Sequence, residues 1–314
     1  MDVHNAFLHG DLNEEVHMKM PLGFYVGRPG PLELYVLVYV DDLIVAGNDS
    51  LPVSAFKAYS GRCFHMKDLG VLKYFLCIEV ARNSEGIFLS QHKYTLDIVV
   101  EAGLLGCKPA AFPMEQYHTL AFAKGAEVSD PEQYRRLVGR LIYLAFTHPD
   151  LAYSVHILAQ FMHHPRLEHG EAALRVVRYL KGRPEQGILL PSAGDVFLTS
   201  WCNSDWASCL LTRRSLTRWV VFLGGSPISW KSRKQHTISR SSAEAEYHSM
   251  DAVTSKLKWL KALLLDLGVQ HSCPMTLFCD SQIQVANIFT KALGKEKFLY
   301  LLRKLSTTFL PTPA

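Results

Sequence analysis

Two adjacent carboxylates, Asp41 and Asp42, interrupt an otherwise apolar run at positions 34–46. Runs of β-branched and aromatic residues favour strands, so the short polar break predicts a hairpin with its acids at or near the turn. Asp is common in ordinary hairpin turns, but that alternative accounts for one acid better than for two without Gly or Asn beside them. We therefore interpret the pair as a candidate metal site, in which one carboxylate points into the site and its neighbour supports it.

A third acid, Asp2, opens a segment that extends to Leu12. Together with Tyr39–Asp42, this segment resembles the two catalytic segments of the reverse transcriptase palm in copia-type LTR retrotransposon Pol polyproteins. Each motif alone is weak evidence, whereas their order along nearly the whole chain is specific. The resemblance continues through Leu69–Leu76, Leu89–Tyr94, Tyr134–Gly139, Leu141–Leu144, Pro149–Tyr153, Tyr179–Gly182, Ser241–Tyr247 and Ile288–Leu293.

The resemblance assigns Asp2, Asp41 and Asp42 to the metal-binding triad of an RNA-directed DNA polymerase, with Asp2 and Asp41 as the main ligands. In that chemistry two Mg²⁺ (or Mn²⁺) ions stabilise the attacking and leaving oxygens of an in-line phosphoryl displacement. Mg²⁺ prefers hard oxygen ligands, so a few carboxylates suffice. The implied partners are a deoxynucleoside triphosphate and a primer–template.

For the C-terminal part, the resemblance implies a ribonuclease H, which cleaves an RNA–DNA hybrid, with four acid positions. Two are present as acids, Glu246 and Asp280, and both are implied catalytic residues and metal ligands. The other two usual Asp positions hold the amides Asn203 and Asn287. An amide oxygen contributes no net negative charge, so these two replacements weaken divalent binding.

Two acids lie close in sequence to the expected site positions, Asp205 and Glu244. Asp205 lies two residues from Asn203 on the same predicted strand, about one strand repeat away, and we do not expect it to take over that role. Glu244 lies two residues from Glu246, and helix residues two apart diverge. We therefore expect Glu246 to face the site and Glu244 to be solvated.

Composition is compatible with an intracellular, cytoplasmic or nuclear protein of about two domains. The chain has 314 residues, of which 48% are hydrophobic, and a formal net charge of +4. That charge permits nucleic-acid binding without demanding it, because counterion release depends on clustered Lys and Arg. No apolar run is long enough for a membrane helix, and no signal peptide is recognised. Seven scattered cysteines suit reduced thiols.

The fold class that we predict is mixed, α+β or α/β. Residues 1–126 are expected to form a partial palm and primer-grip region, residues 127–186 helical thumb or connection elements, and residues 187–314 an incomplete RNase H-like domain. Helices are predicted at 91–102, 129–146, 151–162, 168–180 and 243–267. Strands are predicted at 73–80, 87–89, 187–190, 196–201, 216–223, 228–230 and 275–279.

A basic patch is predicted on the helix that ends near Gly182, formed by Arg175, Arg178, Lys181 and Arg183. Such charges often belong to a solvated helix face. They also suit contacts with the phosphates of a duplex, which are the sequence-independent part of nucleic-acid binding. The sequence leaves these two alternatives open.

Departures from the family pattern argue against catalysis. The spacing between the two palm motifs is shorter by several dozen residues, the fingers that would precede Asp2 are not found, and residue 282 joins almost directly to 285. Cys77 stands where the family usually has Gly. We therefore expect an internally truncated, inactive copy of the polymerase–ribonuclease region. The alternatives are a non-catalytic nucleic-acid-binding remnant and an unselected pseudogene product. Oligomeric state is not predicted.

Overall fold

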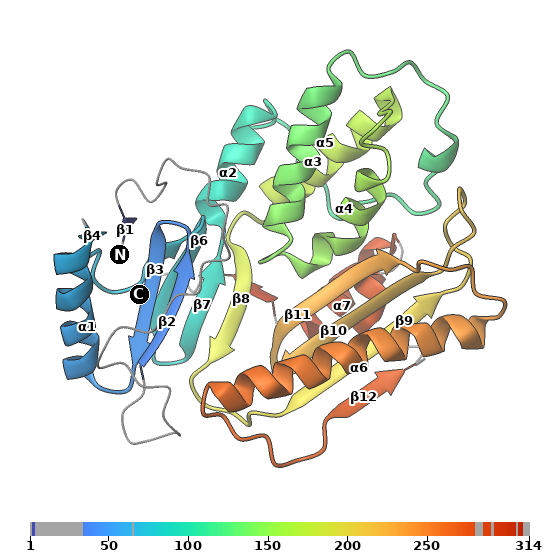
Figure 1. Ribbon diagram of the computed structural model, residues 1–314. Coiled ribbons are helices and arrows are strands. Elements are labelled where there is room, and N and C mark those ends of the chain that lie inside the picture. The colour runs from blue at the N-terminus through green and yellow to red at the C-terminus, as the bar shows by residue number, and fades with distance from the viewer. Residues whose placement is uncertain are drawn as a thin grey trace, which may run out of the picture. The chain divides into compact units, whose positions relative to one another are not determined.

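The computed structural model describes residues 2–3, 34–64, 66–279, 285–289, 292–305 and 307–309. It is a mixed α/β structure with several sheets and, in these ranges, seven α-helices (Figure 1). It divides into two compact units, residues 1–75 and 76–314, which are described separately below. The mixed α/β class is therefore confirmed, whereas the domain boundaries near 126 and 187 stay predictions.

The first unit is built around a sheet in the order β2-β3-β1-β4, with α1 beside β3 and β4. Asp49 caps α1, because its side chain accepts a hydrogen bond from the Leu51 amide at 2.9 Å. The elements are β1 Asp2–Val3, β2 Leu34–Tyr39, β3 Asp42–Gly47, α1 Ser50–Cys63, β4 Met66–Lys67 and β5 Tyr74–Phe75.

The second unit begins with a hairpin and a group of helices that pack into one apolar core. Its elements up to residue 191 are β6 Ile78–Asn83, β7 Gly86–Ser90, α2 His92–Glu101, η1 Leu120–Phe122, α3 Pro131–Leu144, η2 Pro149–Leu151, α4 Ala152–Ala159, α5 Leu167–Lys181 and β8 Gln186–Pro191. Pro131 starts α3, and the Asp130 side chain accepts from the Gln133 amide at 3.0 Å. The four α-helices α2 to α5 were predicted from the sequence, whereas the short 3-10 helices η1 and η2 were not.

Strand β8 was expected to open the C-terminal domain, but it pairs elsewhere. Its partners are β7 on one side and β13 on the other, so β13, β8, β7 and β6 lie in that order in one sheet. The helices α2 to α5 therefore separate two strands that are neighbours in the sheet (Figure 1). Pairing between segments about a hundred residues apart carries no local sequence signal.

The remaining elements form a second sheet with the strand order β11-β10-β9-β12, covered on one face by α6 (Figure 1). β9, β10 and β11 are antiparallel neighbours, and β12 is parallel to β9. The elements are β9 Leu198–Asp205, β10 Leu216–Leu223, β11 Ser226–Lys234, α6 Ser242–Asp266, β12 Thr276–Cys279, η3 Val285–Phe289, α7 Lys295–Lys304 and β13 Thr307–Phe309.

Helix α6 buries one stripe of side chains against β9 and β10. The buried positions recur every three or four residues, as expected for one face of a helix: Ala245, Ser249, Val253, Leu257, Leu260 and Leu264. Ser241 caps its start by accepting from the Glu244 amide at 3.2 Å. Gly268 follows its end with φ of 74°, a backbone conformation that favours glycine. The predicted helix is confirmed.

His156, on α4, is a partly buried imidazole whose charging destabilises the fold. Burial, and secondarily the Lys234 charge, lower its pKa from 6.5 to about 4. Between these pH values the unfolded chain binds more protons than the folded one, so stability falls as pH decreases from about 6.5 to 4. The full shift corresponds to roughly 3 kcal/mol.

We expect His156→Leu to retain more of its neutral-pH stability at pH 4.5 than the unmodified chain, by about 2 kcal/mol. Urea unfolding followed by circular dichroism at pH 7 and pH 4.5 measures this difference. His164→Leu, at an exposed position, is the control and should follow the unmodified chain. Equal acid sensitivity of the two variants would contradict the assignment.

Candidate functional sites

The β2–β3 hairpin carries Asp41 and Asp42 at its tip, as predicted. Tyr39 pairs with Asp42 across the hairpin, so Val40 and Asp41 form the two-residue turn. Asp41 is exposed in the turn, and Asp42 is partly buried as the first residue of β3. Val40 has φ of 52°, which is unfavourable for a β-branched residue. A strained turn residue of this kind often belongs to a functional site.

Strand β1 brings the backbone of Asp2 beside this hairpin. Asp2 is the register partner of Asp42 in the antiparallel β1–β3 pair, and of Lys67 in the β1–β4 pair. The three acids of the predicted polymerase triad thus belong to one end of one sheet. Carboxylate oxygens are suitable Mg²⁺ ligands, so the donor chemistry fits the predicted metal. The Asp2 side chain lies outside the described residues, and its role stays a prediction.

The second candidate site lies where β9 and β12 approach the start of α6. Glu246 reaches from α6 to β9, where its Oε1 accepts a hydrogen bond from the Ser204 amide at 2.8 Å. The Cys279 thiol, at the end of β12, lies 3.3 Å from Glu246 Oε2. Burial raises the pKa of Cys279, as do the neighbouring Cys202 and the hydrogen bond to Glu246. Glu246 therefore faces β9 and β12, and its role as a catalytic acid stays a prediction.

A buried guanidinium, which sequence reasoning missed, occupies this region. Arg218, on β10, is only 1% exposed. Its Nη1 donates to Asn203 Oδ1 at 3.0 Å, and its Nη2 lies 3.2 Å from Asp205 Oδ2. Burial lowers the pKa of Arg218 to about 10, while Asp205 opposes that shift. The one available signal was a charged residue inside the apolar strand 216–223.

This arrangement determines whether the described residues fit a divalent metal. The Asn203 amide oxygen is bonded to Arg218, and the same cation pairs with Asp205. A dication placed beside a buried monocation would be repelled, because charges in a low-dielectric environment are poorly screened. The described residues of this site therefore do not fit Mg²⁺. Throughout the described ranges, no group of three or more His, Cys, Asp or Glu side chains is arranged to hold a metal.

The remaining predicted acid and amide positions divide into two groups. Asp280 follows β12 and lies outside the described residues; Asn287 lies in η3, and its side chain is not described. Glu244 is partly exposed and accepts a hydrogen bond from the Arg240 amide at 2.7 Å, so it helps to cap α6. Neither result adds a further carboxylate to the described part of the site.

The predicted basic patch on α5 is largely used inside the fold. Arg175 pairs with Glu115 at 2.6 Å and stacks over the Phe112 ring. The Lys181 ammonium donates to the Cys107 carbonyl oxygen, and Arg183 lies over the Tyr179 ring. Arg178 is half-buried. Arg175 and Lys181 therefore attach the segment at 107–115 to α5. The role of all four side chains in nucleic-acid binding stays a prediction.

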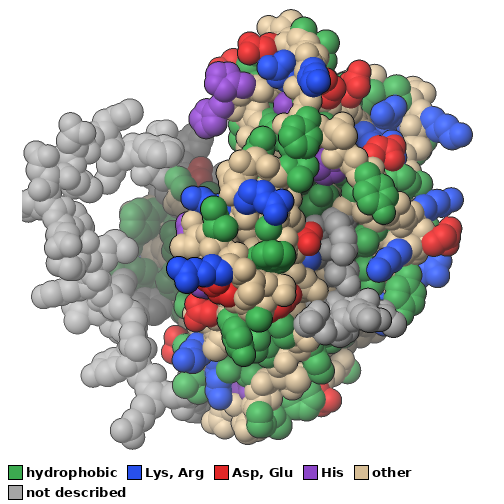
Figure 2. Space-filling view, turned by 90° about the vertical axis from the view of Figure 1, so that its right-hand side faces the viewer, with side chains coloured by type: hydrophobic (Ala, Val, Ile, Leu, Met, Phe, Trp, Pro, Cys, Tyr) green, Lys and Arg blue, Asp and Glu red, His purple; other side chains and the backbone are tan. Residues whose placement is uncertain are grey.

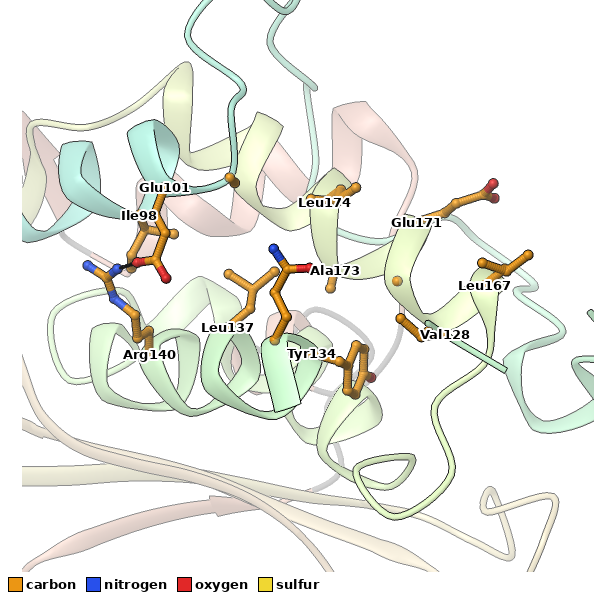
Figure 3. Close-up of a pocket in the computed structure, with 13 residues that line it drawn as sticks. Ile98, Glu101, Val128, Tyr134, Leu137, Arg140, Leu167, Glu171, Ala173 and Leu174 are labelled. Atoms are coloured by element: carbon orange, nitrogen blue, oxygen red, sulfur yellow. Dashed lines mark hydrogen bonds and ion pairs between the residues drawn. The ribbon is translucent and has the colours of Figure 1, made fainter. Parts of the chain in front are cut away.

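A cavity of about 380 Å³ lies between α2, α3 and α5 (Figure 3). Its walls are mainly apolar, and Glu101 and Arg140 point toward one another at one end. Glu101 also pairs with Arg136 at 3.1 Å, so these charges join α2 to α3. The cavity contains none of the predicted site residues. In addition, no helix in the described part of the chain is long and apolar enough to cross a membrane.

Comparisons with known proteins place these observations in a class. Residues 22–116 match the reverse transcriptase (RNA-dependent DNA polymerase) family. The retrovirus-related Pol polyprotein from transposon RE2 of Arabidopsis thaliana is 36% identical over 90% of this chain and 23% of that protein. The Pol polyprotein from transposon TNT 1-94 of Nicotiana tabacum is 28% identical over 90% of the chain and 26% of that protein.

An uncharacterised mitochondrial protein of Arabidopsis thaliana is 38% identical over 73% of this chain and 95% of that protein. The chain belongs to the family of copia-type LTR retrotransposon Pol polyproteins. It spans about a quarter of the length of the transposon polyproteins that it matches.

Proposed function

We propose that this chain represents the reverse transcriptase and RNase H region of a Pol polyprotein, and that it does not catalyse phosphoryl transfer. The observation that carries the proposal is the Arg218 guanidinium bonded to Asn203 and Asp205. In the family resemblance, Asn203 stands at an Asp position that holds metal. A cation of the protein itself is bonded there instead.

The sheet topology supports the RNase H-like assignment of the C-terminal part. Three antiparallel strands, a long helix packed across them and a fourth strand parallel to the first match the predicted order of elements. Glu246 reaches β9 from that helix, where the resemblance expects a catalytic acid. These observations are local to the second unit.

For the polymerase part, support comes from the hairpin acids and from the register of Asp2 with Asp42. This donor set suits Mg²⁺ or Mn²⁺, which would supply charge stabilisation for nucleotidyl transfer if bound. Asp2, Asp41 and Asp42 would hold the ion. The predicted losses near 30–34 and 282–286 remove segments that would support primer, template and nucleotide. The proposed partners are primer–template and RNA–DNA hybrid.

The expected result is no primer extension and no hybrid cleavage by the purified chain with Mg²⁺ or Mn²⁺. A labelled primer on an RNA template and an internally labelled RNA–DNA hybrid measure the two activities. The Asp41→Asn, Asp42→Asn double variant sets the polymerase background, and Glu246→Gln sets the ribonuclease background. Turnover above either background would overturn that half of the proposal.

The alternative is a remnant that binds nucleic acid without turnover. It is favoured by one specific observation, a groove with basic side chains between β11 and α6 of the second sheet. An unselected product with neither property would show no salt-dependent binding of primer–template or hybrid.

A further inference from the structure

Helix α6 leaves one face of an edge strand uncovered. Its buried stripe packs on β9 and β10, and β11 is the last strand on that side of the sheet. A groove of about 630 Å³ therefore runs between β11 and α6. Figure 1 shows α6 crossing the sheet along this face, with β11 at the border.

Four Lys or Arg side chains line this groove: Lys231, Arg233, Lys234 and Lys256. Lys234 donates a hydrogen bond to Gln160 Oε1 at 3.3 Å, and the proposal concerns the other three. Lys231 is the register partner of Trp219, which packs against α6, so Lys231 and Arg233 both point to the α6 side of β11. Within the described part of the chain, none of the three takes part in an ion pair. One carboxylate, Asp251, also lines the groove, and the net charge of the groove lining remains positive.

The cations are close enough to affect one another. Burial lowers the pKa of Lys256, and the Lys231 charge lowers it further. An anion placed between them would relieve this repulsion. Figure 2, a space-filling view of one side of the molecule, shows Lys and Arg side chains spread between apolar side chains.

An exposed indole borders the same groove. Trp259 is 54% exposed, and the Lys256 Nζ lies 3.7 Å from the centroid of its ring. A large exposed aromatic beside a row of cations is the pattern of surfaces that bind single-stranded nucleic acid, where bases stack and phosphates follow the basic groove. Lys231 and Arg233 lie two residues apart on a strand, about 7 Å, so they can reach successive phosphates of an extended strand.

We propose that the groove between β11 and α6 binds the backbone of single-stranded nucleic acid through Lys231, Arg233 and Lys256, with a base against Trp259. Arg218 pairs in register with Ser232, whereas Lys231 points to the opposite face. The groove is therefore separate from the Asn203–Arg218 region, and binding here does not require catalysis. The proposal does not depend on the outcome of the turnover assays.

Fluorescence anisotropy of a labelled single-stranded 20-mer, titrated with the full chain at several salt concentrations, tests the proposal. The Lys231→Ala, Arg233→Ala variant should bind roughly 10- to 30-fold more weakly at 0.1 M salt. Its plot of log affinity against log salt should be less steep by about 1.4, since each phosphate contact contributes about 0.7 for a single strand. Trp259→Ala should weaken binding by about tenfold with little change in slope.

The control variant is Lys258→Ala, Lys261→Ala, which removes the same charge from exposed α6 positions outside the groove. Equal affinities of the groove and control variants would overturn the proposal, as would stronger competition by polyglutamate than by unlabelled DNA. Thermal unfolding of each variant confirms that the fold is retained. If the Lys231→Ala, Arg233→Ala variant does not fold, a Lys231→Gln, Arg233→Gln variant is used in its place.

Discussion

Replacing Asp150 with alanine is expected to lower the free energy of unfolding of the second unit by about 3 to 5 kcal/mol. The Asp150 carboxyl is buried, accepts from the Tyr179 hydroxyl at 2.5 Å and from the Gln186 amide at 2.7 Å, and lies 3.7 Å from His148. Its removal leaves the buried Tyr179 hydroxyl without a partner and leaves the Gln186 amide only the contact with His148 Nδ1 at 3.5 Å, at about 1 to 3 kcal/mol for each weakened donor, together with a small cavity. Urea unfolding at pH 7, followed by circular dichroism, measures the change.

The matched control is Asp97→Ala, on the exposed side of α2, which should change stability by less than about 0.5 kcal/mol. Tyr179→Phe should fall between the two, because it removes one donor and leaves the carboxyl bonded to Gln186. If Asp150→Ala and Asp97→Ala unfold at the same urea concentration, the buried network does not stabilise the fold as argued here.

The second large effect concerns Arg218, whose replacement by methionine is expected to lower the free energy of unfolding by about 2 to 4 kcal/mol. Methionine fills part of the space but leaves Asn203 Oδ1 without its donor. Breaking a buried pair typically costs about 3 to 5 kcal/mol, and Asp205, 38% exposed, recovers part of that by hydration. Urea unfolding of the variant and of the unmodified chain at pH 7 measures this difference in the free energy of unfolding.

Arg214→Met, at an exposed position just before β10, is the control and should be nearly neutral. We also expect that millimolar Mg²⁺ does not stabilise the Arg218 region, so the urea midpoint of the unmodified chain should not rise through binding there. Greater stability of Arg218→Met than of the control would show that the guanidinium is not needed to hold β9 and β10 together.

Much of the local structure was predictable because its signals are local. The capping side chain and proline at 129–131 and the breaker at Gly268 indicate helix ends, and the predicted helices lie within a few residues of their observed bounds. The β2–β3 hairpin followed from the polar break at Asp41 and Asp42 in the same way. Helix caps, turn residues and hydrophobic periodicity are signals that extend over a few residues, so these elements can be predicted from the sequence.

The features that were missed depend on pairing between distant segments. The β7–β8 pair could not be anticipated, and neither could the contact of Arg218 with Asn203, which requires the register of β9 against β10. Two family motifs also gained a physical meaning. Asp150 and Tyr179 come from separate motifs and bond to each other in the core, so this contact joins the two motifs in the fold.

The order in which strands join the β8 sheet has a consequence for how the chain is made. The sheet draws its strands from residues 78–90, 186–191 and 307–309, so its edges cannot close until nearly the last described residues have been synthesised. Until then the edge of β8 that pairs with β13 exposes backbone groups that another chain could pair with. During translation, the nascent chain will thus depend on helices α2 to α5, which form from local contacts, to hold the early strands in place.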